Sequence, residues 1–302
     1  YFIASRGLFK VNSSTGKPLA VVRTRAELGQ HIRAWKQAGE TVGFVPTMGA
    51  LHRGHLSLVE KAREKASRTV ASIFVNPTQF APGEDFDTYP RDSEADISKL
   101  ASVGCDLVYL PTVEEMYPDG NTTNVRVEGM SDLLDGVYRP HFFYGVATVV
   151  ARLFLHVQPD VAVFGEKDYQ QLQIIRRMVR DLGFPVEIIG GETTRDADGL
   201  AQSSRNLYLT ADERIAAGAL QAALHRASVR LAIGVTPSVA LDEARALVTA
   251  AGFRKLDYIS LVDPDTLLDL PDTPLAPGTV ARLLGAAWMG KTRLIDNISA
   301  TR

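Results

Sequence analysis

Two histidines three residues apart, His52 and His55, are the first residues along this sequence whose types and spacing could carry out chemistry. They lie in the run 45–55, which follows a short apolar stretch and leads into a helical pattern. Backbone N–H groups and the positive end of the helix dipole make a helix N-terminus a good binding site for phosphate. Gly49 and Gly54 would let the backbone approach a ligand closely. The pattern predicts a phosphate-binding turn, and two histidines that only cap a helix are the alternative.

A second cluster, 164–171, also follows an apolar run directly. Lys167 would project from the same edge of a sheet, and Asp168 would cap the helix that begins there. A glycine turn with a solvated lysine is the alternative interpretation. A third cluster, 75–80, holds the amides of Asn76 and Gln79 just past another apolar run, where they could orient an acid or simply form a turn.

The fourth cluster, 198–206, contains Ser203, Ser204 and Arg205. Hydroxyls and a guanidinium can clamp a polyphosphate, although a polar interdomain loop has the same composition. All four clusters lie beyond the carboxyl ends of predicted strands or at a domain junction, where open α/β sheets bind ligands. There is no serine triad, cluster of metal ligands or dinucleotide glycine fingerprint. The residues therefore predict a nucleotide-binding α/β enzyme of unknown substrate.

The elements that must position these clusters alternate between apolar runs and helical stretches, which predicts an α/β fold with a doubly wound, Rossmann-like parallel sheet. The predicted strands are 42–45, 70–75, 107–110, 161–164 and 186–189, and the predicted helices are near 55–66, 93–102, 146–157 and 168–182. After residue 192 a smaller α+β domain is expected. Its predicted elements are one helix over 211–233, a second from Pro237 to 251, and strands over 256–262, 279–287 and 292–298. The predicted domains are an N-terminal extension (1–19), a Rossmann-like nucleotide-binding domain (20–192) and a C-terminal domain that closes over the site (193–302).

The run 285–292 matches the Walker A pattern letter by letter. A P-loop requires a long helix after the lysine, and the residues after Thr292 read as a strand instead. The segment 289–291 is therefore predicted to be a hairpin turn.

The composition limits the class of protein. The chain has 302 residues, 45% hydrophobic and 23% charged, as is usual for globular proteins. A net charge of −2 gives no field to hold nucleic acid, and no apolar run approaches the roughly 18 residues of a membrane helix. One cysteine, Cys105, indicates a reducing compartment, and we expect a cytoplasmic protein. The basic, acid-free segment 1–26 is either a transit-type leader or a remnant ahead of the fold.

At these residues the sequence resembles the pantoate–β-alanine ligase family, which belongs to the adenylate-forming nucleotidyltransferases. The similarity runs from about residue 21 to 298. It comprises PTMGALHxGH at 46–55, SIFVNPTQF at 72–80, YPRD at 89–92, FGEKDYQQL at 164–172, DGLA at 198–201, SSRN at 203–206 and RLIDNI at 293–298.

The resemblance implies that pantoate attacks the α-phosphorus of Mg-ATP to give pantoyl adenylate and pyrophosphate, and that β-alanine then displaces AMP to give pantothenate. The domain 20–192 would bind pantoate as well as the nucleotide. The catalytic residues it implies are His55, His52, Lys167 and Arg205. The ATP-binding residues it implies are Met48, Gly49, His52, His55, Gly165, Glu166, Lys167, Asp168, Thr194, Gln202, Ser203, Ser204 and Arg205. Gln79, Gln171 and Asn76 would bind pantoate and β-alanine. Mg²⁺ would arrive with ATP rather than on protein ligands, with no tightly bound organic cofactor, and the chain would form a homodimer.

The sequence departs from the family pattern at several of these positions. Thr194 replaces a small apolar residue, Gln202 replaces Met or Leu, and Arg53 replaces a residue that is commonly acidic. Phe142 stands where the family has histidine, with His141 one residue early. We therefore expect an ATP affinity that differs from the family norm. The alternatives are an adenylyl- or cytidylyltransferase with another acceptor and a nucleotide-binding protein that has lost turnover.

Overall fold

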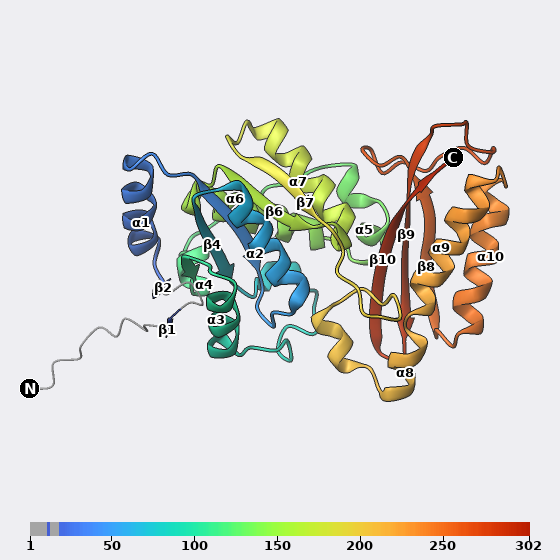
Figure 1. The fold of residues 1–302 in the computed structure, drawn as a ribbon, viewed down its shortest axis with the longest axis horizontal. Coiled ribbons are helices and arrows are strands. Elements are labelled where there is room, and N and C mark those ends of the chain that lie inside the picture. Colours follow the sequence, from blue (N-terminus) through green and yellow to red (C-terminus); the bar gives the residue numbers. More distant parts are fainter. Residues whose placement is uncertain (1–10, 13–17) are drawn as a thin grey trace, which may run out of the picture. The chain divides into compact units, whose positions relative to one another are not determined.

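The computed structural model describes residues 11–12 and 18–302, which fall into two compact units (Figure 1). Most of the extension predicted over 1–19 lies outside these residues. Of the described residues, those up to Arg126 together with His141–Phe164 and Ile175–Gly191 form the first unit. Val127–Pro140, Gly165–Ile174 and Glu192–Arg302 form the second. The chain thus passes between the units several times. No helix within the described ranges is both long enough and apolar enough to cross a membrane.

Within the described residues, the first unit is built on a six-stranded parallel sheet in the order β2-β5-β4-β3-β6-β7. Its strands are β2 (Pro18–Val22), β3 (Val42–Thr47), β4 (Arg68–Ile73), β5 (Leu107–Tyr109), β6 (Val161–Gly165) and β7 (Glu187–Gly191). A short antiparallel strand, β1 (Val11–Asn12), pairs with β2 at one edge. Both β4 and β6 pair with β3, so the strand order reverses there. Such a switch point is where open α/β sheets bind ligands.

Helices cover both faces of this sheet, which confirms the predicted doubly wound class. The helices concerned are α1 (Arg25–Gln37), α2 (Arg53–Lys65), α3 (Ser93–Ser102), α4 (Val113–Met116), α6 (Phe142–Val157) and part of α7 (Tyr169–Leu182). Consecutive strand residues face opposite sides. Val45 packs in one core cluster with Leu58 of α2 and Leu100 of α3, whereas Phe44 meets Phe154 of α6 edge to face at 6.4 Å.

The second unit carries an antiparallel sheet that has three strands among the described residues: β8 (Lys255–Val262), β9 (Val280–Met289) and β10 (Thr292–Thr301), in the order β10-β9-β8. Its longer helices are α8 (Ala211–Ala216), α9 (Ala219–Ala232) and α10 (Pro237–Ala250). Short turns of helix are η2 (Met130–Asp132), α5 (Asp135–Tyr138), η3 (Glu166–Asp168) and η4 (Ser204–Tyr208). Figure 1 shows α9 and α10, in orange, beside the red strands of this sheet. Leu220 and Leu224 of α9 pack with Leu283 and Leu294 in its core.

Local chemistry explains where these elements match the prediction and where they differ. Gly290 supplies the positive φ (+56°) of the β9–β10 turn, which confirms a hairpin rather than a P-loop. The single helix predicted over 211–233 is wrong, because the chain breaks between α8 and α9 at Gly218. A Cβ there would lie 2.9 Å from the backbone oxygen of Asp198, and glycine is a poor helix former. Helix α6 begins at Phe142, earlier than the predicted 146.

Candidate active site

The turn after β3 is held by a buried carboxylate. Gly49 (φ +89°) and Ala50 (φ +51°) both adopt the left-handed region. Asp96 of α3 is 2% exposed, and its two oxygens accept the backbone N–H groups of Ala50 and Leu51, each at 2.8 Å. Lys99 lies 3.6 Å from that carboxylate and donates to the backbone oxygen of Leu51 at 2.8 Å. The start of α2 is therefore fixed from α3.

His52 and His55 lie together at the N-terminus of α2. The Nδ1 of His52, the N-cap residue, accepts the backbone N–H of Gly54 at 3.2 Å, and the Nδ1 of His55 accepts the N–H of His52 at 3.4 Å. The ring centroids are 4.1 Å apart. An Nδ1 that accepts a hydrogen bond places the hydrogen of the neutral imidazole on Nε2. Both capping and phosphate binding are compatible with this geometry, since the Nε2–H edge can donate.

The predicted residues Met48, Asn76 and Gln79 also come together in the first unit. Asn76, 1% exposed, caps the short helix η1 (Pro77–Gln79). Its Nδ2 donates to Gln79 Oε1 at 3.0 Å and to the backbone oxygen of Gly145 at 3.2 Å, while its Oδ1 accepts the Tyr117 hydroxyl at 2.8 Å. Gln79 Nε2 lies 3.2 Å from Met48 Sδ. The Asn76 amide thus orients Gln79.

His141 and Phe142, where a departure from the family pattern is predicted, lie at the start of α6. His141 is exposed and sits at the N-cap with φ +74°, whereas Phe142 is half-buried. Gly145 follows in the first turn of the helix, and a Cβ there would lie 2.4 Å from the backbone oxygen of Thr78. This glycine therefore allows α6 to pack against η1, and against Gln79 in particular.

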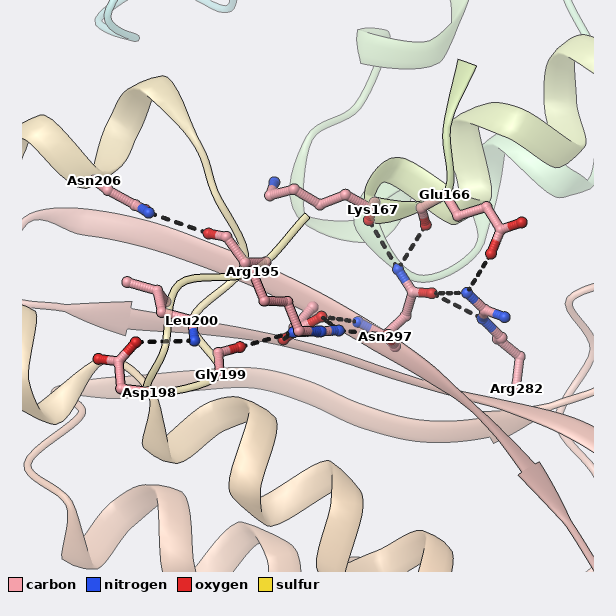
Figure 2. A network of polar contacts seen from close by, with 11 residues as sticks. Glu166, Lys167, Arg195, Asp198, Gly199, Leu200, Asn206, Arg282 and Asn297 are labelled. Atoms are coloured by element: carbon pink, nitrogen blue, oxygen red, sulfur yellow. Dashed lines mark hydrogen bonds and ion pairs between the residues drawn. The ribbon is translucent and has the colours of Figure 1, made fainter. Parts of the chain in front are cut away.

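In the second unit, the turn that carries Lys167 is held by Asn297 of β10 (Figure 2). The Asn297 Nδ2 donates to the backbone oxygens of Glu166 at 2.9 Å and Lys167 at 2.8 Å. Although Glu166 and Asp168 flank it, the Lys167 ammonium makes no ion pair within the described residues. The Glu166 carboxylate instead lies 3.5 Å from Arg282, whose pKa is lowered by burial. The Lys167 ammonium is therefore left unpaired by both flanking carboxylates.

The nucleotide loop, residues 194–202, begins with Thr194 and ends with Gln202, both predicted to bind ATP. It forms a short hairpin closed by an isolated bridge between Arg195 and Ala201. The Gln202 backbone N–H donates to the Thr194 oxygen, and its Nε2 donates to Asp196 Oδ1, both at 2.9 Å. These two hydrogen bonds fix Gln202 at the base of the hairpin. Arg195 forms a bidentate ion pair with Asp296 of β10, at 2.6 and 2.8 Å. The hairpin is therefore also tied to β10.

The predicted residues Ser203, Ser204 and Arg205 follow this hairpin directly. Ser203 caps η4, and its hydroxyl accepts the Arg205 backbone N–H at 3.3 Å. The Asn206 Nδ2 donates to the backbone oxygen of Ala201 at 3.1 Å, which closes the segment onto the hairpin. The remaining predicted residues of this unit, Gly165 and Gln171, lie at the end of β6 and in the first turn of α7.

Sequence reasoning missed the residues that hold these segments, namely Asp96, Asp296 and Asn297. Asp96 precedes Leu100 by four positions, so it lies on the buried stripe of α3, and a carboxylate on such a stripe signals a buried partner. Asp296 and Asn297 belong to a strand pattern that gives no comparable signal. In the described part of the chain, no group of three or more His, Cys, Asp or Glu side chains could hold a metal ion.

A doubly wound parallel sheet with a histidine pair at a helix N-terminus beside its switch point is an arrangement typical of nucleotide-binding α/β enzymes. The chain matches the family model described as pantoate-beta-alanine ligase over residues 20–299. It therefore belongs to the pantoate-beta-alanine ligase family, and it is an enzyme of the ligase class.

Relatives and solved structures agree with this family. The chain is 75% identical over 293 residues to a pantothenate synthetase of Hyphomonas neptunium, covering 97% of this chain and 100% of the relative. A crystal structure of pantothenate synthetase from Thermus thermophilus superimposes with a TM-score of 0.87 at 50% identity, covering 93% of this chain and 99% of that one. A ligase from Francisella tularensis, complexed with beta-gamma ATP and beta-alanine, gives a TM-score of 0.76 at 34% identity, covering 92% and 96%.

Proposed function

We propose that this chain condenses pantoate with β-alanine at the expense of ATP, and that it forms pantothenate, AMP and pyrophosphate through a pantoyl adenylate. Family membership over residues 20–299 supports the reaction class. The observation that carries the residue assignment is the pair His52 and His55, whose Nδ1 atoms are both engaged by backbone N–H groups at a helix N-terminus. In the neutral rings this arrangement puts the hydrogen on Nε2, at a helix N-terminus where a phosphate would be favoured.

In the first half-reaction, a carboxylate oxygen of pantoate attacks the α-phosphorus of ATP. The bond from that phosphorus to the bridging oxygen breaks, and pyrophosphate leaves with the electron pair. Negative charge builds up on the phosphates, so the chemistry needs fixed positive charge and hydrogen-bond donors more than a covalent nucleophile. Lys167, Arg205 and the two histidines would supply them, with His55 donating to the leaving pyrophosphate.

In the second half-reaction, the amine of β-alanine attacks the acyl carbon of the adenylate. The carbon–oxygen bond to AMP breaks, and the amine nitrogen loses a proton. Gln79 and Gln171 would hold pantoate, and Gln79 would also face β-alanine. Asn76, whose side chain is bonded to Gln79, would act by orienting it. Water must be excluded at this stage, because the mixed anhydride hydrolyses readily.

The remaining predicted residues would bind the nucleotide. Asp168 would contact the ribose, and Ser203 with Ser204 would close over the phosphates. Met48, Gly49, Gly165, Glu166, Thr194 and Gln202 would line the nucleotide. Mg²⁺ would enter as the ATP complex. We also propose a cytoplasmic homodimer, and the buried free thiol of Cys105 suits a reducing compartment.

The test is AMP release by the full chain with ATP, pantoate and β-alanine, and with each omitted in turn. The expected result is pantoate-dependent ATP–pyrophosphate exchange and AMP release that requires all three substrates. Exchange without pantoate would indicate a transferase with another acceptor, and ATP binding without AMP release would indicate a protein without turnover. Either outcome contradicts the proposal.

Lys167→Ala tests the residue assignment in the same assay. Removing one well-aimed donor typically costs about 10²–10³ in rate. Lys291→Ala is the matched control, because Lys291 is exposed in the β9–β10 turn. Equal loss in both variants, or in neither, would contradict the role of Lys167.

A further inference from the structure

Asp296 and Asn297 are consecutive residues of β10, and both are buried, at 5% and 3% exposure. Consecutive side chains of a strand leave on opposite faces. Leu294 and Ala300, which share the face of Asp296, belong to the core cluster that contains Leu200 of the nucleotide loop. Buried polar side chains are kept in a fold only where they find partners. The two residues find theirs in two different loops.

Asn297 holds the turn that carries Lys167. Its side-chain NH2 group donates to two consecutive backbone oxygens, those of Glu166 and Lys167. Its Oδ1 accepts Arg282 Nε at 2.8 Å and a second hydrogen bond from the same guanidinium. Figure 2 shows the Lys167 side chain extending away from Asn297. Asn297 thus fixes the backbone from which the lysine projects, without touching its ammonium.

Asp296 holds the hairpin that precedes Ser203–Arg205. Its carboxylate takes both ends of the Arg195 guanidinium, and Arg195 Nη1 also donates to the backbone oxygen of Gly199 at 2.9 Å. One arginine therefore ties β10 to both arms of the hairpin. Bidentate arginine–carboxylate pairs fix orientation as well as distance.

We propose that Asp296 and Asn297 are positioning residues. From one strand they align the turn that carries Lys167 (166–168) and the loop that ends in Ser203–Arg205, so that both segments meet the same triphosphate. The proposal rests on the proposed function, because it assumes that both segments bind ATP. The competing explanation is that the pair only stabilises the second unit. The two explanations differ in what they predict for ATP, since a purely stabilising pair would leave the affinity for ATP unchanged in the folded protein.

The test variant is Asn297→Asp. It keeps the size of the side chain and the oxygen that accepts from Arg282. It replaces the NH2 group, which donates to the backbone oxygens of Glu166 and Lys167, with an oxygen that repels them. The matched control is the reverse change, Asp257→Asn. Asp257 of β8 is also buried, and its partners Arg293, at 2.8 Å, and Trp288, at 3.1 Å, belong to neither loop. Both variants are measured in the full chain, for the apparent Tm and for the kcat and KM of each substrate.

We expect Asn297→Asp to lower kcat/KM for ATP by roughly 10²-fold, as misplacement of a catalytic group by about 1 Å does. The KM for pantoate should stay unchanged, and the rise in Tm on adding Mg-ATP should be lost. Asp257→Asn should lower the Tm without ATP but keep the ATP-induced rise and the KM for ATP. If Asn297→Asp does not fold, Asn297→Ser removes the same donors without adding charge.

Asp296→Asn extends the test to the other loop, because it weakens the Arg195 pair and should also raise the KM for ATP. A normal KM for ATP and a normal ATP-induced rise in Tm in the Asn297 variant would overturn the proposal. So would an equal rise in the KM for ATP and for pantoate. A wild-type chain that makes no AMP would contradict the proposed function instead, and the ATP-induced rise in Tm would still test the positioning role.

Discussion

The buried carboxylate of Asp96 accepts the backbone N–H of Ala50 at 2.8 Å, two residues before His52. Its other oxygen takes the next N–H along the chain, that of Leu51. Ala50 has φ +51°, a conformation that disfavours a residue with a Cβ. The carboxylate stabilises this strained backbone, so it controls where α2 and its two histidines begin.

Asp96→Asn should therefore disturb the backbone of residues 49–52, the turn that leads into His52 and His55. One amide hydrogen of asparagine would oppose a backbone N–H, leaving a buried donor unpaired at a cost of about 1–3 kcal/mol. We expect kcat/KM for ATP to fall by roughly 5- to 150-fold, with less effect on the KM for β-alanine. Steady-state kinetics with each substrate varied will measure this. An unchanged KM for ATP together with a lowered Tm would assign Asp96 to stability alone.

Gly145→Ala should displace Gln79. The new Cβ would lie 2.4 Å from the Thr78 backbone oxygen, so α6 and η1 must separate. Such overpacking typically costs about 1–3 kcal/mol, and the KM for pantoate should rise with it. Gly29→Ala in α1 is the control, because its Cβ would meet only the flexible end of Arg33. Pantoate kinetics and thermal unfolding of both variants check the prediction, which fails if the two behave alike.

His156 should make stability depend on pH. Burial, with help from Arg25, lowers its pKa from 6.5 to about 4, and its Nδ1 lies 3.0 Å from the Tyr109 hydroxyl. Between these values the unfolded chain binds a proton that the folded chain does not. Stability therefore rises with pH from about 4 to 6.5, by at most about 3 kcal/mol, and this contribution is constant above that window.

His156→Gln, which keeps an acceptor for Tyr109, should flatten that slope, and denaturant unfolding from pH 4 to 7 will measure it. His225→Gln is the control, since His225 is exposed on α9. A slope that survives in His156→Gln would point to other titrating groups.

Gln202→Met introduces one of the residue types that the resemblance implies for this position. The change removes the 2.9 Å hydrogen bond to Asp196, which also pairs with Arg214 at 2.8 Å. Loss of one such bond, worth about 0.5–1.5 kcal/mol, should raise the KM for ATP by roughly 2- to 10-fold. ATP titration in the exchange assay checks this, and equal nucleotide binding in both forms would show that the substitution has no consequence.

The sequence predicted the parts of the fold that follow from repeated pattern. Short runs of Val, Ile and Phe bounded by Gly or Pro identified β3 to β7, and Gly290 identified the β9–β10 hairpin. The helix predicted over 211–233 failed because its alanine-rich pattern conceals the close approach of Gly218 to Asp198. The prediction of alternating elements began at residue 42, so it did not include β2 and α1, which lie before that residue.

The candidate site was predicted only where its residues have chemistry of their own. His52, Lys167 and Arg205 carry charge or a proton, so they stand out in a sequence. Asp96 and Asn297 act through backbone groups of other segments, and a single sequence does not reveal which backbone a buried side chain will meet. Such partners become visible only when distant segments are placed in three dimensions.

The bond from Asn297 to Lys167 spans 130 residues of sequence, and this separation affects how the enzyme is made. A ribosome that adds about 5–20 residues per second needs on the order of ten seconds after it has added Lys167 to reach Asn297. During that interval the emerging polypeptide carries the lysine without the strand that aligns it. The growing chain should therefore be unable to commit ATP to adenylation until β10 has left the exit tunnel and joined its sheet.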